Sequence, residues 1–395
     1  MLVRVRVLAA CSLGGAGHLR PLVPFLDEAR RAGAQTLLVG PPGLEAMAAA
    51  TGHPFRAGRE PPESRVRPIR EQLAVAPPDE ASVLGNRELF GRLAAIAMLP
   101  AMFGAIRDWR PDVILRDPCE YSSATVAAEL GLTAFQVAIS LAEVERGSIA
   151  VAGPALEELR DGLTADLLRS PYLTRFPAAL DPSPFPGTAR YREPAPARSG
   201  RLPAWRDFAA ASAPLVYVTL GTVLGHMSFA EESYRAVIDA VTGVDARVLV
   251  TTGRGFDPAR LRDVPGNVHV EAWVDQADVL PEAALVVCHG GSGTTFGALA
   301  AGLPVVVIPA FADQFANGQK VASAGAGLVV RAGGFPAADS GGSRAPFGRD
   351  DARLIRAAIE TVLGDGSYRD RARSIAAQMS AAPEISALLP ALARR

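Results

Sequence analysis

The sequence is poor in lysine and cysteine, and it contains no apolar run of membrane-span length that is free of charge. Lys320 is the single lysine among 40 basic residues, which 41 acidic residues balance. Because the two signs nearly cancel, no net field is available to recruit nucleic acid or an acidic membrane surface. Residues 1–10 alternate apolar residues with arginine, which is typical of a strand and not of a signal peptide. We therefore expect a cytoplasmic protein with no stable membrane insertion.

The three cysteines are too few and too scattered for a disulfide framework or a metal site. Cys11, Cys119 and Cys288 each lie in or beside an apolar, strand-like run, and they share no metal-ligand spacing. Such a pattern is typical of buried thiols in a reducing compartment. We therefore predict neither a disulfide nor a zinc site.

The length of 395 residues suits two domains of nearly 200 residues each. Strand-like and helical runs alternate in both halves, which predicts parallel βαβ units and an α/β fold. Eight prolines between residues 171 and 203 are too many for either helix or strand, and we place the interdomain linker in the later part of that stretch. The expected domains are residues 1–200 and 201–395, with the option that the last helix packs back on the N-terminal domain.

The expected elements can be stated by residue. The predicted strands are 3–9, 36–39, 113–115, 134–138, 216–220, 248–251, 268–272, 285–288, 305–308 and 328–330. The predicted helices include 19–31, 44–50, 122–130 and 229–241. Both sheets are then Rossmann-like, and ligands in such sheets bind at the carboxyl ends of the strands. Residues 332–350, rich in glycine and proline, are expected to form a surface loop.

The most informative stretch is CHGGSGTTFGALAAGL, residues 288–303. It predicts a buried strand ending at His289, a glycine-rich turn, and a helix whose first turn contains Ser292, Gly293 and Thr294. Free N–H groups and the positive end of the helix dipole at such a turn suit a phosphate or diphosphate. Tight packing alone also produces glycine-rich turns, and for the glycines taken by themselves that interpretation stays open.

Two further strands end in residues suited to proton transfer. The first strand runs into a turn that contains His18, and residues 113–115 run into Asp117. Histidine and aspartate at the same end of one sheet can form a dyad, in which the carboxylate fixes the ring tautomer and stabilises the imidazolium. Alternatively, Asp117 caps the helix that starts near Tyr121. The residues alone do not separate these two interpretations.

The glycine-rich segment, followed by an apolar run and then Asp313-Gln314, resembles the donor-sugar signature of the family 1 glycosyltransferases. The resemblance is specifically to the bacterial natural-product branch, which includes glycosyltransferases of enediynes, macrolides and polyketides. The resemblance covers most of the chain and is strongest over residues 215–320. It implies a GT-B fold, in which two Rossmann-like domains face each other across a cleft. It also implies inverting, metal-independent transfer of a sugar, expected here to be a deoxy sugar, from a nucleotide diphosphate to a small acceptor.

The resemblance also assigns roles to individual residues. His18 matches the catalytic base and Asp117 its partner. Trp273 matches the tryptophan that stacks on the pyrimidine, although a core tryptophan is the alternative. The helix start and His289 would together stand in for a metal cation, and no two aspartates are spaced as the Asp-x-Asp metal motif requires. The expected donor-binding residues are Thr222, Trp273, Val274, Gln276, His289, Gly291, Ser292, Gly293, Thr294, Asp313 and Gln314.

Gly297 departs from the best-known pattern of the family. Uridine-dependent relatives have a glutamate there that accepts hydrogen bonds from the ribose hydroxyls, so glycine favours a thymidine diphosphate sugar. No cofactor is expected beyond this co-substrate, and the partners are a small aglycone and, as an option, a second copy of the chain.

The acceptor side is less informative. The apolar residues between 89 and 103 suit either an acceptor pocket or an amphipathic helix broken at Pro100. The rival functions are an inactive nucleotide-sugar-binding homologue, and an epimerase or hydrolase on the same fold.

Overall fold

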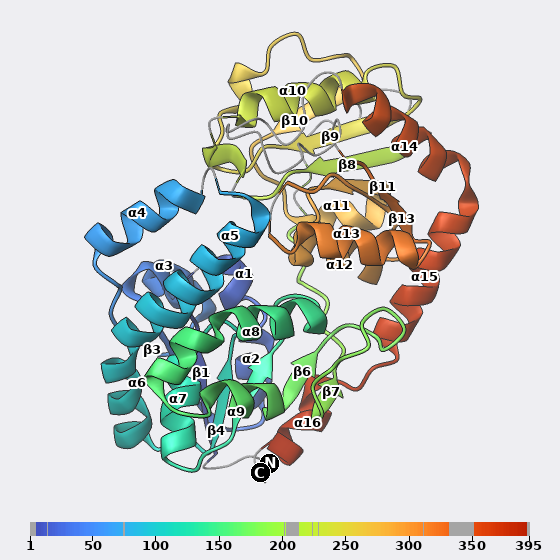
Figure 1. Ribbon diagram of the computed structural model, residues 1–395. Coiled ribbons are helices and arrows are strands. Elements are labelled where there is room, and N and C mark those ends of the chain that lie inside the picture. The colour runs from blue at the N-terminus through green and yellow to red at the C-terminus, as the bar shows by residue number, and fades with distance from the viewer. Residues whose placement is uncertain are drawn as a thin grey trace. The chain divides into compact units, whose positions relative to one another are not determined.

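The computed structural model divides into two compact units. It describes residues 5–13, 15–73, 76–200, 202, 213–222, 224–227, 229–310, 312–331 and 351–392. Unit 1 comprises residues 1–194 and 381–395, and unit 2 comprises residues 195–380. Each unit has its own parallel sheet with helices around it (Figure 1). The predicted loop at 332–350 lies outside the described residues.

The sheet of unit 1 has seven strands among the described residues, all parallel. In sheet order they are β3 (Phe55–Ala57), β2 (Gln35–Gly40), β1 (Arg6–Ala10), β4 (Val113–Arg116), β5 (Ala134–Val137), β6 (Tyr172–Thr174) and β7 (Thr188–Arg190). Ala10 at the end of β1 pairs with Arg116 at the end of β4. The turns that follow these two strands therefore leave the same edge of the sheet side by side.

The helices of unit 1 lie between these strands and at the end of the described chain. In chain order they are α1 (Ala16–Leu19), α2 (Val23–Arg31), η1 (Pro42–Leu44), α3 (Glu45–Thr51), α4 (Glu63–Leu73), α5 (Pro78–Ser82), the π-helix η2 (Val83–Ala94), α6 (Ala95–Trp109), α7 (Ser122–Glu129), α8 (Ala142–Leu159), α9 (Leu163–Arg169) and α16 (Ile385–Leu392).

The sheet of unit 2 has six parallel strands in the part that the structure describes. In sheet order they are β10 (Val268–Glu271), β9 (Arg247–Thr251), β8 (Leu215–Thr219), β11 (Ala283–Cys288), β12 (Val305–Val307) and β13 (Gly327–Val329). Its helices are η4 (Leu224–His226), α10 (Ala230–Val241), η5 (Pro258–Arg260), α11 (Gln276–Val279), η6 (Leu280–Glu282), α12 (Ser292–Ala300), α13 (Gln314–Ser323), α14 (Ala352–Gly364) and α15 (Gly366–Ser380).

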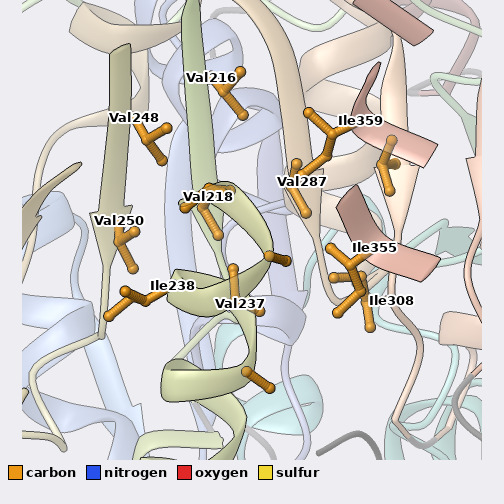
Figure 2. Packing of buried hydrophobic residues seen from close by; sticks show 14 of the residues in the cluster. Val216, Val218, Val237, Ile238, Val248, Val250, Val287, Ile308, Ile355 and Ile359 are labelled. Atoms are coloured by element: carbon orange, nitrogen blue, oxygen red, sulfur yellow. The ribbon is translucent and has the colours of Figure 1, made fainter. Parts of the chain in front are cut away.

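The core of unit 2 shows why its strands are unbroken apolar runs. Val216 and Val218 of β8 point to one face of the sheet, where they form a buried cluster with Val237 of α10 and with Ile355 and Ile359 of α14 (Figure 2). Alternate residues of the strand point to the other face, which is buried as well. Each such side chain contributes about 1.5–3 kcal/mol by leaving water.

All the strands predicted from the sequence are present, which confirms the α/β class and the parallel sheets. The proline-rich stretch was wrongly judged unable to form a strand. β6 and β7 are only three residues long, and they fit between the prolines because no strand position is itself a proline.

Two helix predictions are also corrected. The single helix expected at 19–31 is two helices, α1 and α2, because Pro21 falls between them and Pro24 occupies the first turn of α2, where its fixed φ is tolerated. Pro100 does not break α6. Proline removes one backbone donor, but Met98 and Met102 on either side of it are buried and hold the helix in the core.

One helical stretch is long and apolar enough to cross a membrane by length and composition alone. It covers Asp79–Trp109 in the part of the chain that the structure describes, and its most apolar window has a mean hydropathy of 1.8. Its longest run without charge is 93–106, shorter than the roughly 20 residues of a spanning helix. Met98, Met102 and Ile106 pack in a buried cluster of unit 1. One face of the stretch therefore packs in the core, whereas Ile96 and Phe103 are exposed.

The chain returns to unit 1 after completing unit 2. α16 packs against α2 and contributes Ile385, Leu389 and Leu392 to the buried cluster around it. Arg192, in the segment that leaves unit 1, forms an ion pair with Glu384 in the segment that returns. The segment that leaves unit 1 and the segment that returns to it are thereby connected within unit 1.

Candidate active site

A histidine and an aspartate meet where two neighbouring strands of unit 1 end. His18 lies in α1, directly after β1, and Asp117 follows β4. His18 Nδ1 lies 3.1 Å from Asp117 Oδ1. The carboxylate is fully buried, whereas 15% of the His18 side chain is exposed. A hydrogen bond from Nδ1–H to the carboxylate fixes the tautomer in which Nε2 accepts a proton.

Backbone groups fix the orientation of the Asp117 carboxylate. Ser12 N donates to Oδ2 at 2.6 Å, and Cys119 N donates to Oδ1 at 2.8 Å. The first turn of α7 is capped by a different acid, because Ser122 N donates to Glu120 Oε1 at 3.0 Å. The alternative interpretation, in which Asp117 is the cap of this helix, is therefore wrong.

Arg116 is a buried cation that the sequence analysis did not assign. Its side chain is fully buried, and its Nη1 donates to the carbonyl oxygens of Asp117, Pro118 and Glu120 at 3.1–3.2 Å. Burial lowers the pKa of Arg116, and the nearby Glu120 carboxylate opposes that effect. The guanidinium ties the turn that carries Asp117 to the end of β4. An arginine closing an otherwise apolar strand is the sequence signal that points to it.

An aromatic ring covers His18 in unit 1. The Phe90 and His18 ring centroids are 5.5 Å apart, and the rings are 23° from parallel. Phe90 belongs to the π-helix η2, a rare form that often occurs at functional sites. Of the apolar residues considered for an acceptor pocket, Phe90 reaches the dyad, whereas Met98 and Met102 are in the core.

Cys119 adds a third potential metal ligand beside the dyad. One ligand atom from each of His18, Asp117 and Cys119 lies within 4.8 Å of the others. Imidazole, carboxylate and thiolate are all zinc ligands. Both Asp117 oxygens already accept hydrogen bonds, so a metal ion would have to displace the bond to His18. Metal-independent chemistry stays a prediction, and this cluster makes metal addition and removal informative.

The glycine-rich turn of unit 2 joins β11 to α12. Gly290 has a φ of +90°, and a Cβ there would lie 2.8 Å from both Gln314 O and Val307 Cγ1, so glycine is required. The helix begins at Ser292, and the N–H groups of its first turn have no partner within the helix. This is the anion-binding geometry predicted from the sequence.

His289 lies between two glycines at this turn. An added Cβ at Gly221 would be 2.7 Å from the His289 ring, and one at Gly291 would be closer still. Among the described residues, His289 Nδ1 has no hydrogen-bond partner. Desolvation lowers the pKa of His289 to about 4, against opposing effects of Asp313 and the Thr219 backbone. His289 is therefore neutral at pH 7 in the ligand-free protein, and its role beside the helix start in place of a metal cation stays a prediction.

Asp313 and Gln314 lie at the start of α13. Asp313 Oδ2 accepts hydrogen bonds from Ser292 Oγ and from Asn317 Nδ2, each at 2.9 Å. Gln314 is buried, and its Oε1 accepts a hydrogen bond from Ala310 N at 2.8 Å. The structure therefore links Asp313 to the glycine-rich turn. The sequence analysis missed Asn317, whose spacing of four from Asp313 places both on one helix face.

The segment after β10 carries three of the predicted residues. Trp273 is 39% exposed, which rules out the alternative of a core tryptophan. The Arg254 guanidinium lies 5.4 Å from the Trp273 ring centroid, at a distance typical of a cation–π contact. Val274 is buried, and Gln276 Nε2 donates to Thr294 Oγ1 at 3.0 Å, which connects this segment to the start of α12.

Two predicted residues lie at more open positions. Thr222, after β8, is exposed. Gly297 lies on α12, and a Cβ there would meet no atom of the described residues within 4 Å. Gly293 is exposed and Thr294 is partly exposed at the start of the same helix. A larger side chain at 297 therefore has room.

Comparisons with known proteins agree with this arrangement. The family described as erythromycin biosynthesis protein CIII-like, C-terminal domain, matches residues 235–393. The elloramycin glycosyltransferase of Streptomyces olivaceus is 33% identical over 345 residues, which cover 82% of this chain and 85% of that protein. The L-demethylnoviosyl transferase of Streptomyces niveus is 28% identical over 400 residues, 98% of each protein. The solved structure of the spinosyn rhamnosyltransferase has a TM-score of 0.75 at 25% identity, covering 98% of this chain and 100% of that one.

Two α/β units with parallel sheets, one of them with a glycine-rich turn between β11 and α12, define an enzyme of the GT-B glycosyltransferase class. The chain belongs to the natural-product branch of the family 1 glycosyltransferases, which confirms the resemblance found in the sequence.

Proposed function

We propose that this glycosyltransferase moves a deoxy sugar from thymidine diphosphate to a hydroxyl group of a small natural-product acceptor, with inversion at the anomeric carbon. The observation that carries the proposal is the 3.1 Å contact between His18 Nδ1 and the buried Asp117 carboxylate. It leaves His18 Nε2 as the basic nitrogen. General-base catalysis of this kind contributes typically 10²–10⁴ in rate.

In the proposed reaction, His18 Nε2 takes the proton of the acceptor hydroxyl as its oxygen bonds to the anomeric carbon. The bond between that carbon and the diphosphate oxygen breaks, and its electron pair leaves with the nucleoside diphosphate. Attack opposite the leaving group inverts the anomeric configuration. Asp117 stabilises the imidazolium that forms, and the bonds from Ser12 N and Cys119 N hold its carboxylate in place.

Unit 2 supplies the donor site in this proposal. The N–H groups at the start of α12 bind the diphosphate, and neutral His289 adds a hydrogen bond where negative charge develops. Asp313 accepts hydrogen bonds from sugar hydroxyls, and the exposed face of Trp273 stacks on the base. No bound cofactor or metal has a role in this scheme, which uses the chain's own residues throughout.

Two structural features and the names of two relatives support the choice of substrates. Gly297 offers no charged acceptor to a ribose hydroxyl, so a deoxyribose loses nothing there. On the acceptor side, Phe90 beside His18 offers an aromatic face to a flat apolar molecule. The names of the elloramycin and spinosyn enzymes specify natural-product sugar transfer, which supports the same acceptor class for this chain. We place the protein in the cytoplasm with two small-molecule substrates.

A substrate screen tests the proposal. Thymidine and uridine diphosphate sugars are incubated with a panel of polyketide and macrolide aglycones, and mass spectrometry detects products heavier by one glycosyl group. Free sugar as the sole product, without need of an acceptor, would favour an epimerase or hydrolase. Binding of nucleotide sugars without any turnover would favour an inactive homologue.

A further inference from the structure

One buried amide connects the glycine-rich turn of unit 2 to the carboxylate at the start of α13. Asn317 is fully buried, and its Nδ2 donates to Gly290 O at 2.8 Å, to Asp313 Oδ2 at 2.9 Å and to Ser292 Oγ at 3.1 Å. Ser292 Oγ donates in turn to Asp313 Oδ2. These four residues, Gly290, Ser292, Asp313 and Asn317, are called the Asn317 bridge below.

The contacts determine which end of the amide faces the bridge. Gly290 O and the ionised Asp313 carboxylate are acceptors only, so both require the NH₂ group of Asn317. Asn317 Oδ1 points elsewhere and has no hydrogen-bond partner among the described residues. The bridge thus depends on a directional donor. A leucine at 317 would keep the approximate size of the side chain and lose the donor without adding charge.

Packing supports the turn independently of the amide. A Cβ at Gly290 would lie 2.8 Å from Val307 Cγ1 and from Gln314 O, and a Cβ at Gly318 would lie 3.0 Å from Val307 Cγ1. The backbone of the turn is therefore held against β12 and α13 by close contact. The orientation of Asp313 depends more directly on the bridge, since two bonds to its Oδ2 come from Ser292 and Asn317.

We propose that Asn317 is a positioning residue, which keeps the Asp313 carboxylate in register with the diphosphate-binding turn. The inference rests on the proposed function, in which the turn binds the diphosphate and Asp313 binds the sugar. Asn317 is fully buried, so it acts through Asp313 and Ser292 and not on the donor itself. A hydrogen bond to an ionised group is about twice as strong as a neutral one, which makes Asp313 the partner that loses most. Loss of the amide then impairs recognition of the sugar and leaves diphosphate binding largely intact.

The test separates the two halves of the donor. Asn317→Leu removes the donor at similar size without adding charge, and Asn317→Ala removes the side chain. Calorimetry measures the affinities for thymidine diphosphate and for the thymidine diphosphate sugar that the native protein turns over fastest, and initial rates give kcat and KM. We expect thymidine diphosphate affinity to stay within about threefold of native, and kcat/KM for the sugar nucleotide to fall by about 10- to 100-fold.

Unit 2 contains a matched control. Asn267 Nδ2 also donates to three acceptors, the carbonyl oxygens of Val241, Val244 and Ala246, at 3.2–3.3 Å. Asn267→Leu and Asn267→Ala remove an equal number of bonds away from the turn. They should lower the melting temperature and leave the affinity ratio of sugar nucleotide to thymidine diphosphate unchanged. A purely structural role for Asn317 would give the same result as Asn267.

The outcomes distinguish the two proposals. If the native protein binds no sugar nucleotide, the proposed function fails, whatever the variants do. If the native protein turns over its donor and the Asn317 variants lose affinity equally for both ligands, or for neither, the positioning role is overturned. Should the Asn317 variants fail to fold, Ser292→Ala removes one arm of the bridge with a smaller change in volume. It should shift the affinity ratio in the same direction, and an unchanged ratio overturns the inference as well.

Discussion

The two units each place a histidine in the segment that follows a parallel strand, and they surround it in opposite ways. His18 in unit 1 lies 3.1 Å from a buried carboxylate and beneath the ring of Phe90. His289 in unit 2 is enclosed by Gly221 and Gly291, and its pKa is lowered to about 4. One imidazole has an ionised partner, while the other has lost water without gaining such a partner at hydrogen-bonding distance.

The difference shows that the partner of a histidine, and not its position in the fold, decides what it can do. A carboxylate stabilises the imidazolium, so His18 is equipped to gain a proton during a reaction. Desolvation disfavours the imidazolium, so His289 is neutral in the ligand-free protein and is suited to sharing a hydrogen bond with a phosphate. The following predictions test this contrast, beginning with the largest expected effect.

Removing the proton acceptor should have the largest effect. We expect His18→Ala to lower kcat/KM for transfer by roughly 10²- to 10⁴-fold, because the acceptor hydroxyl loses its base. Thymidine diphosphate affinity, measured by calorimetry, should be nearly unchanged. His289→Ala is the matched variant, and it should weaken diphosphate binding. Native rates in His18→Ala would remove the assignment of His18.

Acid should destabilise unit 2 through His289. Above pH 6.5 the residue is neutral in both folded and unfolded chains, and its contribution to stability is fully present. As the pH falls from 6.5 to about 4, His289 becomes protonated in the unfolded chain and stays neutral in the folded chain. The free energy of unfolding therefore decreases. The loss approaches about 3 kcal/mol, at about 1.4 kcal/mol per pKa unit.

Urea unfolding between pH 7 and pH 4 measures this loss. The pH dependence of the free energy of unfolding should be shallower in His289→Asn than in the native protein. His226→Asn changes a histidine that is exposed and should leave the slope as it is. Equal slopes for all three proteins would contradict the enclosed, neutral state of His289.

Neutralising the partner of His18 tests the other side of the comparison. Asp117→Asn keeps the size of the side chain, but its NH₂ favours the tautomer with the proton on Nε2. We expect kcat to fall by roughly 10²-fold. Asp112→Asn, at an exposed acid that accepts a bond from Arg6 N, serves as control and should retain full turnover. Turnover close to native in Asp117→Asn would mean that His18 does not depend on this carboxylate.

The nucleotide preference tests the donor site of unit 2, to which His289 belongs. Gly297 lacks the glutamate that holds a ribose in uridine-dependent relatives, so thymidine diphosphate should bind about 10-fold to a few hundred-fold more tightly than uridine diphosphate. Competitive calorimetry measures the ratio. Gly297→Glu has room for its side chain and should shift the ratio toward uridine diphosphate. Equal affinities in the native protein would remove the argument.

The smallest effect is expected from a chelator. Activity should be the same with and without EDTA, because the start of α12 supplies the positive potential for the diphosphate. Added zinc tests the cluster of His18, Asp117 and Cys119, and Cys119→Ser is the control for ligation there. Loss of activity in EDTA, restored by magnesium or manganese, would contradict metal-independent transfer.

Local chemistry explains which features the sequence was able to predict. The strands were evident because both faces of a parallel sheet are buried, which makes each strand an apolar run. His18 and His289 were found because each stands next to a glycine-rich turn after such a run. These signals lie within a few residues of the side chain concerned.

The missed features depend on residues far apart in the chain. Phe90 reaches His18 across more than seventy positions, and nothing near Phe90 distinguishes it from the core methionines. The lowered pKa of His289 comes from enclosure by Gly221, which belongs to a different strand end. The roles of Arg116 and Asn317 follow from which carbonyl and carboxylate oxygens the fold brings to them. Spacing along the chain does not contain that information.

The two segments of unit 1 are synthesised at different times, the first before unit 2 and the second after it. Unit 2 is inserted between residues 194 and 381 of unit 1, so a ribosome completes all of unit 2 before it makes α16. Until Ile385, Leu389 and Leu392 emerge, the surface of α2 that they cover is open to solvent and to chaperones. The unit that is translated first is therefore the one that closes its core last.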